Sequence, residues 1–451
     1  MKPLEKSLEI VGRDREVISQ ASRIAYYPLV VERASGSRLW DVDGNEYLDF
    51  LSGAAVNNVG HCHPRVVEAI REQAGRLIHN TLGYTYYELA VALAERLTQL
   101  TPGGFRKRVS FSLSGSDAND GAIKLARAST GRPKVVSFLG SYHGTTYGAL
   151  TLSAITPRMR RRLGPMLPEV YHVPYPDCYR CYFGLEYPDC GLHCLGHIET
   201  LLEMVLPPDE VATFILEPIQ GDAGIIIPPE EFWPRLKGLC EEQGILFFDE
   251  EVQTGFARTG RMFAIEHWKV EPDAVIAAKP MAAGLPMAAL IARAELMERW
   301  VAPAHLFTTE ANPVACSAAL ATLDVIEGEE LTERAERLGE AAMRRLREMM
   351  EAYELIGDVR GKGLLIGVDL VRDRERREPA RVEAMKVCWR AWERGLVIIS
   401  FGRFGNVLRI APPLTISEEE LMEGLDIIEA SIRDVIEGKV PDSVLEKMVA
   451  W

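Results

Sequence analysis

The sequence predicts an α/β protein with a large domain around a mostly parallel central sheet and a smaller α+β domain. From about residue 105 onward, short β-rich runs alternate with helical patterns, as in strand–helix–strand units of a parallel sheet. A long helical region follows, and then strand-like pieces separated by helices. The chain has 451 residues, which is enough for two or three domains and a large core.

The strands of the large domain are short runs of β-branched, aromatic and other apolar residues. We expect them at residues 108–113, 134–139, 211–219, 245–250 and 273–279. Helices are expected between the strands, for example at residues 117–130 and 230–244. A long helical region is then expected over residues 312–352.

The smaller domain is predicted from strand-like pieces near the end of the chain, at residues 361–371, 395–400 and 406–412. Residues 38–51 have the pattern of a hairpin with an Asp-Gly-Asn turn, and we assign this hairpin to the same domain. The predicted organisation is therefore an N-terminal segment, 1–60, that contributes to the small domain, a large domain, 61–315, and a C-terminal small domain, 316–451.

Composition excludes several classes of partner. The formal net charge is -14, and no Lys/Arg-rich block offsets it, so nucleic acid and anionic membranes are poor partners. Hydrophobic residues make up 47% and charged residues 26%, which is typical of a globular protein. The first residues, MKPLEKSLEIVGRDRE, contain no apolar core of a secretory signal, so we expect a cytoplasmic protein.

Four of the eight cysteines are clustered in one short segment, at Cys178, Cys181, Cys190 and Cys194. Reduced thiols in a surface loop are the first expectation, because that is their usual state in a mesophilic cytosol. A structural crosslink, either one zinc site or two disulfides, follows closely. We do not expect these cysteines to take part in catalysis, since no other feature of the sequence converges on them.

One lysine, Lys279, lies in the otherwise uncharged and mostly apolar stretch from Ala274 to Ala292. A bare ammonium in an apolar interior is costly, so such a lysine must be paired, neutral or chemically used. The stretch is as long as a membrane span, but Pro280, Gly284 and Pro286 argue against one. The alternative without chemistry is a lysine that extends from a strand end into solvent.

Other chemistry-bearing residues follow predicted strands, at the carboxyl ends where ligands of open α/β sheets gather. The segment Ser114-Gly115-Ser116 opens a helix, which suits a phosphate, although small residues also cap helices without a ligand. The carboxylates Glu217 and Asp249-Glu250-Glu251 end two other strands, where solvation or salt bridges are the ordinary alternative.

Two further residues, Tyr142 and Arg409, are candidates for contact with a ligand. Tyr142 follows a predicted strand, where an aromatic ring more often packs than stacks on a ligand. Arg409 lies among apolar residues, where an arginine usually needs a carboxylate partner. A phosphate cup, a strand-end carboxylate, a flat ring, a buried lysine and an arginine together fit pyridoxal 5'-phosphate (PLP) and an amino acid. Lys279 would form a Schiff base, and Arg409 would bind the substrate α-carboxylate. We expect no metal at this site.

Over nearly its full length the chain resembles the fold-type-I, class III aminotransferases. The resemblance is carried by the following ordered stretches: LWDVDGNEYLDFLSG, GHCHPRVVEAI, SGSDANDGAIKLARASTGR, YHGTT, EPIQGDAGI, EEVQTGFARTGRMFA, AAKPMAAGLP and ANPVACSAALATLDVI. It implies the PLP-dependent transferase fold type I, with residues 61–315 as the PLP-binding domain. It also implies that Lys279 is the PLP lysine and that Arg409 binds the α-carboxylate.

The same resemblance assigns the remaining cofactor contacts. It places the PLP phosphate on Gly115 and Ser116, and the cofactor ring against Tyr142. Gln253 would lie near the cofactor hydroxyl. Thr308 would contact the phosphate bound by a neighbouring subunit, which implies a homodimer or a higher homo-oligomer with shared active sites.

Departures from the family pattern bear on the reaction. The family has an aspartate directly before Glu-Val-Gln to pair with the pyridine nitrogen, and Glu250 stands there in this chain. We assign that role to Glu250, with Asp249 as the alternative, because alternate strand residues face opposite ways. Thr145 replaces the arginine of 4-aminobutyrate aminotransferases, and Ala54, at the substrate site, replaces the tyrosine of ornithine aminotransferases.

The most informative departure is Asp222, in EPIQGDAG. Typical ω-aminotransferases have a glutamate there that masks the α-carboxylate arginine. A branch of the family, isoleucine 2-epimerase and the broad-substrate amino-acid racemases, has an aspartate used as a second acid/base. This chain resembles that branch also in SYHGTTYGALTLSAI, VPYPD, GDAGIIIPPEE and APAHLFTT. The alternative interpretation is a shortened loop carboxylate, with transamination intact.

The resulting prediction is PLP-dependent racemisation or 2-epimerisation of a free, neutral aliphatic amino acid. Lys279 would act on one face of the α-carbon and Asp222 on the other, through an aldimine and a planar quinonoid intermediate. The alternatives are a class III aminotransferase that uses the same lysine and a PLP-fold sensor without catalysis. Retention of Lys279, Arg409 and the phosphate loop argues against the sensor.

Overall fold

The computed structural model describes residues 2–448, which divide into two compact units. Pro64–Thr332 form the large unit, and the residues up to His63 together with those from Glu333 onward form the small unit. Helix α10 (Pro313–Gly328) belongs to the large unit, because it packs on α3 (Pro64–Ala74), where Ser317 Oγ donates to Ala69 O at 3.0 Å. The division therefore falls after Thr332, whereas the sequence placed it after residue 315.

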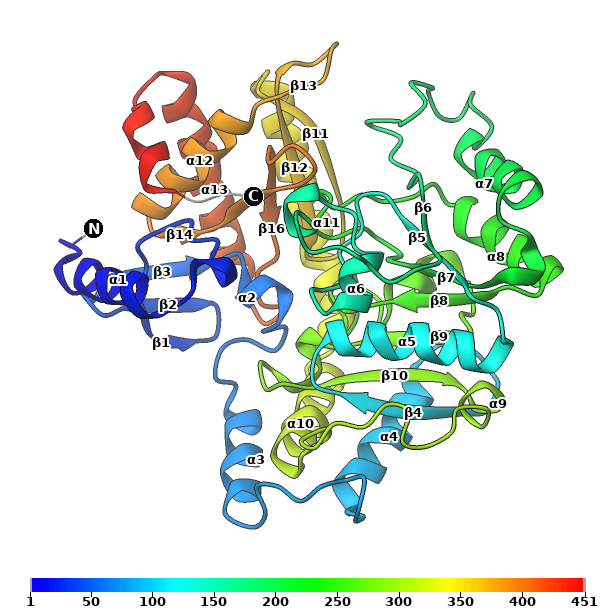
Figure 1. Ribbon diagram of the computed structural model, residues 1–451. Helices are drawn as coiled ribbons and strands as arrows, with labels where there is room; N and C mark the ends of the chain where they lie inside the picture. Colours follow the sequence, from blue (N-terminus) through cyan, green and yellow to red (C-terminus); the bar gives the residue numbers. More distant parts are fainter. Residues whose placement is uncertain (1, 449–451) are drawn as a thin grey trace. The chain divides into compact units, whose positions relative to one another are not determined.

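A seven-stranded sheet forms the centre of the large unit (Figure 1), in the order β4-β10-β9-β8-β7-β5-β6. All of its strands run in one direction except β10, which is antiparallel to both neighbours. The strands are β4 (Lys107–Ser112), β5 (Lys134–Phe138), β6 (Val170–Val173), β7 (Val211–Leu216), β8 (Leu246–Glu250), β9 (Ala274–Ala277) and β10 (Ala288–Arg293).

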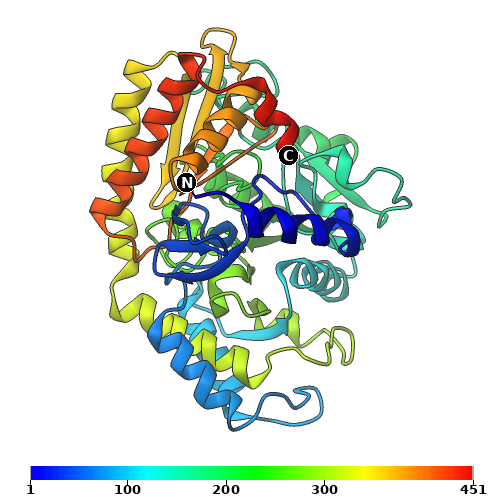
Figure 2. The same cartoon turned by 90° about the vertical axis from the view of Figure 1, so that its left-hand side faces the viewer.

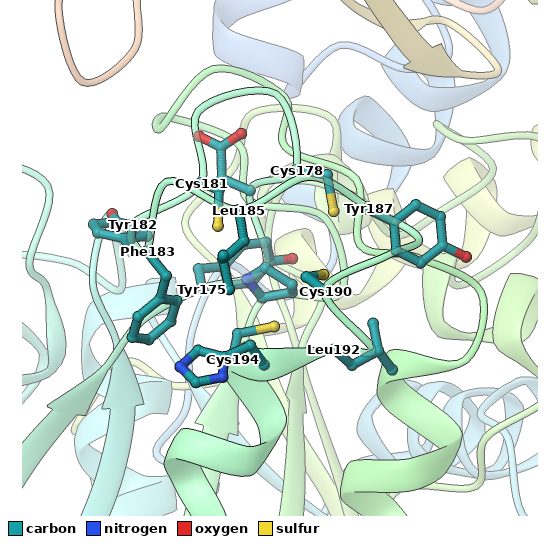
Figure 3. Close-up of a pocket in the computed structure, with 13 residues that line it drawn as sticks. Tyr175, Cys178, Cys181, Tyr182, Phe183, Leu185, Tyr187, Cys190, Leu192 and Cys194 are labelled. Atoms are coloured by element: carbon teal, nitrogen blue, oxygen red, sulfur yellow. The ribbon is translucent and has the colours of Figure 1, made fainter.

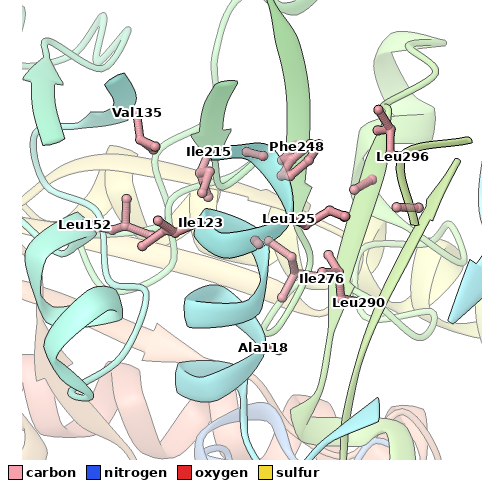
Figure 4. Packing of buried hydrophobic residues seen from close by; sticks show 14 of the residues in the cluster. Ala118, Ile123, Leu125, Val135, Leu152, Ile215, Phe248, Ile276, Leu290 and Leu296 are labelled. Carbon is pink, nitrogen blue, oxygen red and sulfur yellow. The ribbon is translucent and has the colours of Figure 1, made fainter. Parts of the chain in front are cut away.

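Helices cover both faces of this sheet. Helix α5 (Gly115–Thr130) buries Ala118, Ile123 and Leu125 in a core that includes Phe248 of β8 (Figure 4). The ring of the preceding residue, Phe247, lies 6.2 Å from that of Trp233 in α8 (Phe232–Gln243). Because successive strand residues face opposite sides, α5 and α8 lie on opposite faces.

Five strands of the large unit, β4, β5, β7, β8 and β9, are confirmed where the sequence predicted them. Two strands were missed. β6 is a short, half-buried edge strand, and half of the residues of β10 are alanine, which has low strand propensity. The helical region at 312–352 is two helices, α10 and α11 (Leu331–Ala352), separated at Glu330, which adopts a φ of 51°.

Asp273, directly before β9, accepts hydrogen bonds from three elements, α8, β8 and β10. Its Oδ2 accepts hydrogen bonds from Lys237 Nζ of α8 at 3.1 Å and from the Phe247 backbone N–H of β8 at 2.9 Å. Its Oδ1 accepts a hydrogen bond from Arg293 Nε, at the end of β10, at 2.7 Å. The start of β9, whose other end leads to Lys279, is thereby held against both neighbouring strands.

Between residues 64 and 332, the large unit contains eight further helices and helical turns. They are α4 (Glu88–Leu100), α6 (Tyr147–Leu152), α7 (His193–Met204), α9 (Ala294–Met297), η2 (Pro157–Met159), η3 (Pro208–Glu210), η4 (Ala264–Trp268) and η5 (Lys279–Ala282). No helix within residues 2–448 is both long and apolar enough to cross a membrane.

The small unit contains two sheets, in the orders β1-β2-β3-β14 and β11-β12-β16-β15, with β13 paired to β12. The predicted hairpin is confirmed as β2 and β3, and its parallel pairing with β14 joins it to the C-terminal part of the chain. The strands are β1 (Val31–Ser35), β2 (Arg38–Asp41), β3 (Glu46–Asp49), β11 (Ile356–Lys362), β12 (Leu365–Asp373), β13 (Glu378–Pro379), β14 (Leu396–Val397), β15 (Ile399–Phe401) and β16 (Val407–Ile410).

Helices α11 and α13 run side by side in the small unit, shown in yellow and red-orange in Figure 2, and Arg345 of α11 donates to Asp426 of α13 at 3.2 Å. Helix α12 packs against β15 and β16. Arg409 lies on β16. The helices of this unit are α1 (Glu5–Val17), η1 (Gln20–Ser22), α2 (Ser52–Ala55), α12 (Arg381–Glu393), α13 (Glu418–Ile436) and η6 (Asp442–Lys447), together with α11.

Candidate active site

The residues predicted to form a site in the large unit follow five strands of its sheet, β4, β5, β7, β8 and β9. These strands run in the same direction, so their carboxyl ends lie at one edge of the sheet. The structure therefore brings the segments that carry Ser116, Tyr142, Asp222, Glu250 and Lys279 to a common edge, where ligands of open α/β sheets bind.

The segment after β4 forms the N-terminus of α5. Ser114 caps this helix through a reciprocal contact with Asp117, which accepts a hydrogen bond from the Ser114 backbone N–H at 2.7 Å. A Cβ atom on Gly115 would lie 2.9 Å from both methyl groups of Val252, so only glycine fits there without displacement. Backbone N–H groups in the first turn of α5, a helix of 16 residues, suit an anionic ligand.

The loop after β5 closes against this helix N-terminus. Ser116 Oγ accepts a hydrogen bond from the Thr145 backbone N–H at 3.1 Å. A Cβ atom on Gly144, whose φ is 124°, would lie 2.0 Å from that oxygen. Asn119 Nδ2 donates to Gly115 O and to His143 O, both at 3.0 Å. The loops after β4 and β5 therefore form a small cradle that side chains larger than glycine would fill.

Glu250 and His143 form a buried pair that joins β8 to the loop after β5. Nδ1 of His143 lies 3.0 Å from Oε2 of Glu250, and the backbone N–H of His143 donates to Ser153 Oγ at 2.8 Å. Oε1 of Glu250 accepts the Val252 backbone N–H at 2.8 Å. Each carboxylate oxygen of Glu250 therefore has one partner and can accept a second hydrogen bond.

Asp249 faces the other side of β8, because strand residues alternate and Asp249 shares its side with Phe247. Both of its carboxylate oxygens are buried and have no hydrogen-bond partner within residues 2–448. Burial, and then the charge of Glu251, raises the pKa of Asp249 well above its usual value. The structure thus separates two neighbouring carboxyl groups that the sequence could not tell apart.

Three acidic residues and one tyrosine interact at the end of β7. Glu217 accepts the Tyr142 backbone N–H at 3.4 Å. Burial, followed by the charges of Glu250 and Asp222, raises the pKa of Glu217 well above its usual value. Burial, followed by Asp222 and Glu250, also raises the pKa of Tyr142. Glu217 therefore favours its protonated form, and Glu250 contacts His143, the residue next to Tyr142.

Asp222 lies half-buried in a turn whose shape is fixed by its flanking residues. Gln220 and Ile226 exchange backbone hydrogen bonds at 3.1 and 3.0 Å across the turn, and Gln220 Nε2 donates to Leu139 O at 3.0 Å. A Cβ atom on Gly221 would lie 1.8 Å from Gln253 Oε1, so the Gln253 amide lies directly against this turn. Both polar atoms of that amide are buried without a hydrogen-bond partner in the described part of the chain.

Lys279 follows the buried Ala278, which is the first residue after β9, and is half-buried. Its φ of 22° is unusual for a residue with a side chain, and such strained backbone is common at functional positions. Pro280 follows and the chain turns sharply, with Met281 N–H donating to Ala278 O at 2.8 Å. Across residues 2–448 no hydrogen bond or ion pair to Lys279 Nζ is found.

Arg409 and Ala54 belong to the small unit. Arg409 is buried on β16, with its guanidinium 3.9 Å from the centre of the Phe401 ring. Ala54 lies in a left-handed turn, α2, with a φ of 64°. Ser52 Oγ in this turn donates to Ala411 O at 2.6 Å, so the turn lies next to the chain that leaves β16. Thr308, in the large unit, is exposed in the connection between α9 and α10.

These residues fit PLP on three observations. The cradle at Gly115, Ser116 and Gly144 suits a phosphate, the unpartnered Gln253 amide suits a polar ring substituent, and the unpaired Lys279 amine is available for a covalent link. His143 was not among the residues predicted at the site, and Glu217 was singled out as a strand-end carboxylate without a specific role. Their signals were present as the residue next to Tyr142 and as a carboxylate directly after an all-apolar strand.

The chain belongs to the Aminotransferase class-III family, which it matches over residues 19–432. It is 50% identical to the leucine/methionine racemase of Thermococcus litoralis over 443 residues, which cover 98% of this chain and 99% of the relative. It is 46% identical to the isoleucine 2-epimerase of Lentilactobacillus buchneri over 441 residues, or 98% of each chain.

The fold is also that of a solved structure, the PLP-bound amine transaminase from an uncultivated Pseudomonas species. The TM-score is 0.84 at 31% identity, and the match covers 90% of this chain and 94% of that one. The protein is therefore a PLP-dependent enzyme with the fold-type-I architecture that the sequence predicted.

The position of the charge on β8 can be tested with two matched substitutions. Glu250→Gln should lower turnover by about 10²–10³-fold, because it removes a fixed charge from the face that carries Tyr142. Asp249→Asn should change turnover by less than about 3-fold, because the raised pKa already favours the neutral carboxyl. Steady-state kinetics of both variants at saturating PLP give the comparison. A larger loss for Asp249→Asn would assign the charge to Asp249.

Proposed function

We propose that this protein is a PLP-dependent racemase or 2-epimerase of free amino acids with neutral aliphatic side chains. The observation that carries the proposal is the position of Asp222, a half-buried carboxylate that interacts with Tyr142 and Glu217 at the sheet edge to which Lys279 belongs. The racemase and the epimerase that share about half of its sequence support the same reaction.

The geometry of the large unit supports the following cofactor contacts. Gly115 and Ser116 would bind the phosphate at the N-terminus of α5, and Tyr142 would pack on the ring. Glu250, which His143 contacts, would provide the negative charge for the pyridine nitrogen. Gln253 would donate to the ring hydroxyl, and Lys279 would form the covalent link. Bound PLP supplies an electron sink, which makes the α-proton of an attached amino acid acidic.

Racemisation requires a proton to leave one face of the α-carbon and another to arrive on the opposite face. Two acid/base groups on opposite sides accomplish this most directly. Lys279 supplies one and Asp222 the other. Because the Gln220–Ile226 backbone pairing fixes the turn, Asp222 is held in place without direct support from a helix or strand.

Arg409 binds the substrate α-carboxylate through two parallel hydrogen bonds. Its guanidinium is already oriented by the Phe401 ring, so little freedom is lost when the carboxylate binds. Ala54 leaves room for the substrate side chain. By their names, the two relatives act on leucine, methionine and isoleucine, and these substrates support a preference for apolar side chains.

Two chains assemble into a homodimer in which Thr308 of one chain contacts the phosphate bound by the other. Thr308 is exposed in the single chain, which leaves it accessible to a second chain. A monomeric mass in light scattering of the holoenzyme would contradict this assembly.

Transamination by the same lysine is the second candidate, and the structural likeness to an amine transaminase favours it. It needs a single acid/base group, since the proton moves between two positions on one face. The two reactions therefore differ in their dependence on Asp222.

Asp222→Asn should lower conversion of an L-amino acid to its D-enantiomer by at least about 10²-fold, because it removes one of the two proton carriers. Exchange of the α-proton for deuterium should persist with one enantiomer, through Lys279. The measurement follows chirality, deuterium incorporation and keto-acid formation, with and without a keto-acid acceptor. Asp209→Asn, an equal change of charge at an exposed site, is the control.

If the unmodified protein forms keto acid at full rate and never produces the D-enantiomer, the aminotransferase function is correct and Asp222 is a shortened loop residue. Equal loss of exchange with both enantiomers in Asp222→Asn would show that Asp222 supports the cofactor site instead.

Arg409→Ala should reduce kcat/KM for every α-amino acid by about 10–150-fold, because a charge-assisted contact of this kind contributes roughly 1.5–3 kcal/mol. Arg409→Lys should recover part of the loss, since it restores the charge without the bidentate geometry. Deuterium exchange into an amine that lacks a carboxylate should change little in either variant. An equal loss for the amine would show that Arg409 serves the fold.

A further inference from the structure

The cysteine-rich segment, residues 174–192, contains neither helix nor strand and connects β6 to α7. Irregular segments of this length are uncommon in compact units and need something other than backbone pairing to hold them. Cys178, Cys181, Cys190 and Cys194 are distributed along this segment and the first turn of α7. None of them is used by the proposed reaction.

The four cysteines gather around one small cavity (Figure 3), and all four line it. Its volume is about 20 Å³, which is enough for one body the size of a water molecule or an ion. The rest of its lining is largely aromatic and apolar, including Tyr175, Phe183 and Leu192. The four side chains come from two closely spaced pairs, Cys-x2-Cys and Cys-x3-Cys.

All four cysteines are free thiols in the structure, and a thiol becomes a metal ligand when it loses its proton.

We propose that Cys178, Cys181, Cys190 and Cys194 bind one structural zinc ion. The spacing of each pair is that of zinc-binding cysteine pairs, and four thiolates complete a tetrahedral shell without an open position for a substrate. One Zn²⁺ replaces four thiol protons, which are released to solvent. In the thiol form, no group of three or more potential ligands within residues 2–448 has metal-binding geometry, so the side chains must rotate toward the cavity centre as the metal binds.

The zinc ion would stabilise a segment that supports the active site. At the base of this segment, the Tyr175 hydroxyl donates to Glu217 O at 2.9 Å and to Pro218 O at 3.1 Å. Its ring packs against Phe138 and Trp233 at 5.6 and 5.7 Å. The segment is therefore attached to the chain that leads from β7 to Asp222. The metal acts on stability and takes no part in the chemistry.

Metal content of the full-length holoenzyme is the first test. Protein purified without chelator and dialysed against metal-free buffer should contain one zinc ion per chain by elemental analysis. An organomercurial titration, followed with a zinc-sensitive dye, should release that ion as the thiols react. Cys178→Ser and Cys194→Ser should each lower the zinc content by at least about 10-fold, because each removes one thiolate ligand. Cys62→Ser, at an exposed cysteine outside the cluster, is the matched control and should retain the metal.

Thermal unfolding and activity separate a structural ion from other functions. Removal of zinc by a strong chelator should lower the midpoint of thermal unfolding of the unmodified protein by about 5 °C or more. Racemisation per folded holoenzyme below that midpoint should stay within about 2-fold, because no step depends on the ion.

Two results would overturn the proposal. One is a metal-free protein with all eight thiols titratable in denaturant, and the other is a protein with two disulfides between the four cysteines. Both are read from the unmodified protein, so they do not depend on whether the serine variants fold. Neither result bears on the racemase function, which is tested by chirality at the substrate.

Discussion

The buried hydrogen bond between His143 and Glu250 is the contact on which the arrangement of the site depends. It joins the carboxyl end of β8 to the loop after β5, across the intervening strand β7. The parallel registers of β5 with β7 and of β7 with β8 bring both residues to the same edge. Removal of His143 would leave a carboxylate buried with one fewer partner, so the loop that carries Tyr142 and the charge on β8 are linked energetically.

The site concentrates acidic groups where water is excluded. Glu217, Asp222 and Glu250 interact with one another, and the structure relieves their repulsion by keeping a proton on Glu217. The positive end of the α5 helix dipole lies at the same edge of the sheet. The carboxylates would therefore favour a cationic ring and amine, and the helix N-terminus would favour a phosphate.

The loops of the site are held by contacts outside the regular elements. Gln220 fixes the Asp222 turn through Ile226 and Leu139, and Tyr175 holds the preceding residues by their carbonyl groups. Lys279 and Ala54 adopt backbone conformations that are costly for residues with side chains, and both lie in short helical turns outside the strands.

The sequence by itself determined the α/β class, five strands of the large sheet, the hairpin at residues 38–51 and the family, because these depend on local periodicity and on ordered motifs. It also placed Lys279, Ser116 and Asp222 after strands. Only the tertiary structure decided that Glu250, and not Asp249, pairs with His143, and that β10 returns antiparallel between β4 and β9. A strand pattern shows that neighbouring residues face opposite sides, but the choice of side depends on which helix covers each face. Burial and pKa likewise depend on groups distant in the chain, so the protonated state of Glu217 follows from packing and not from its neighbours in sequence.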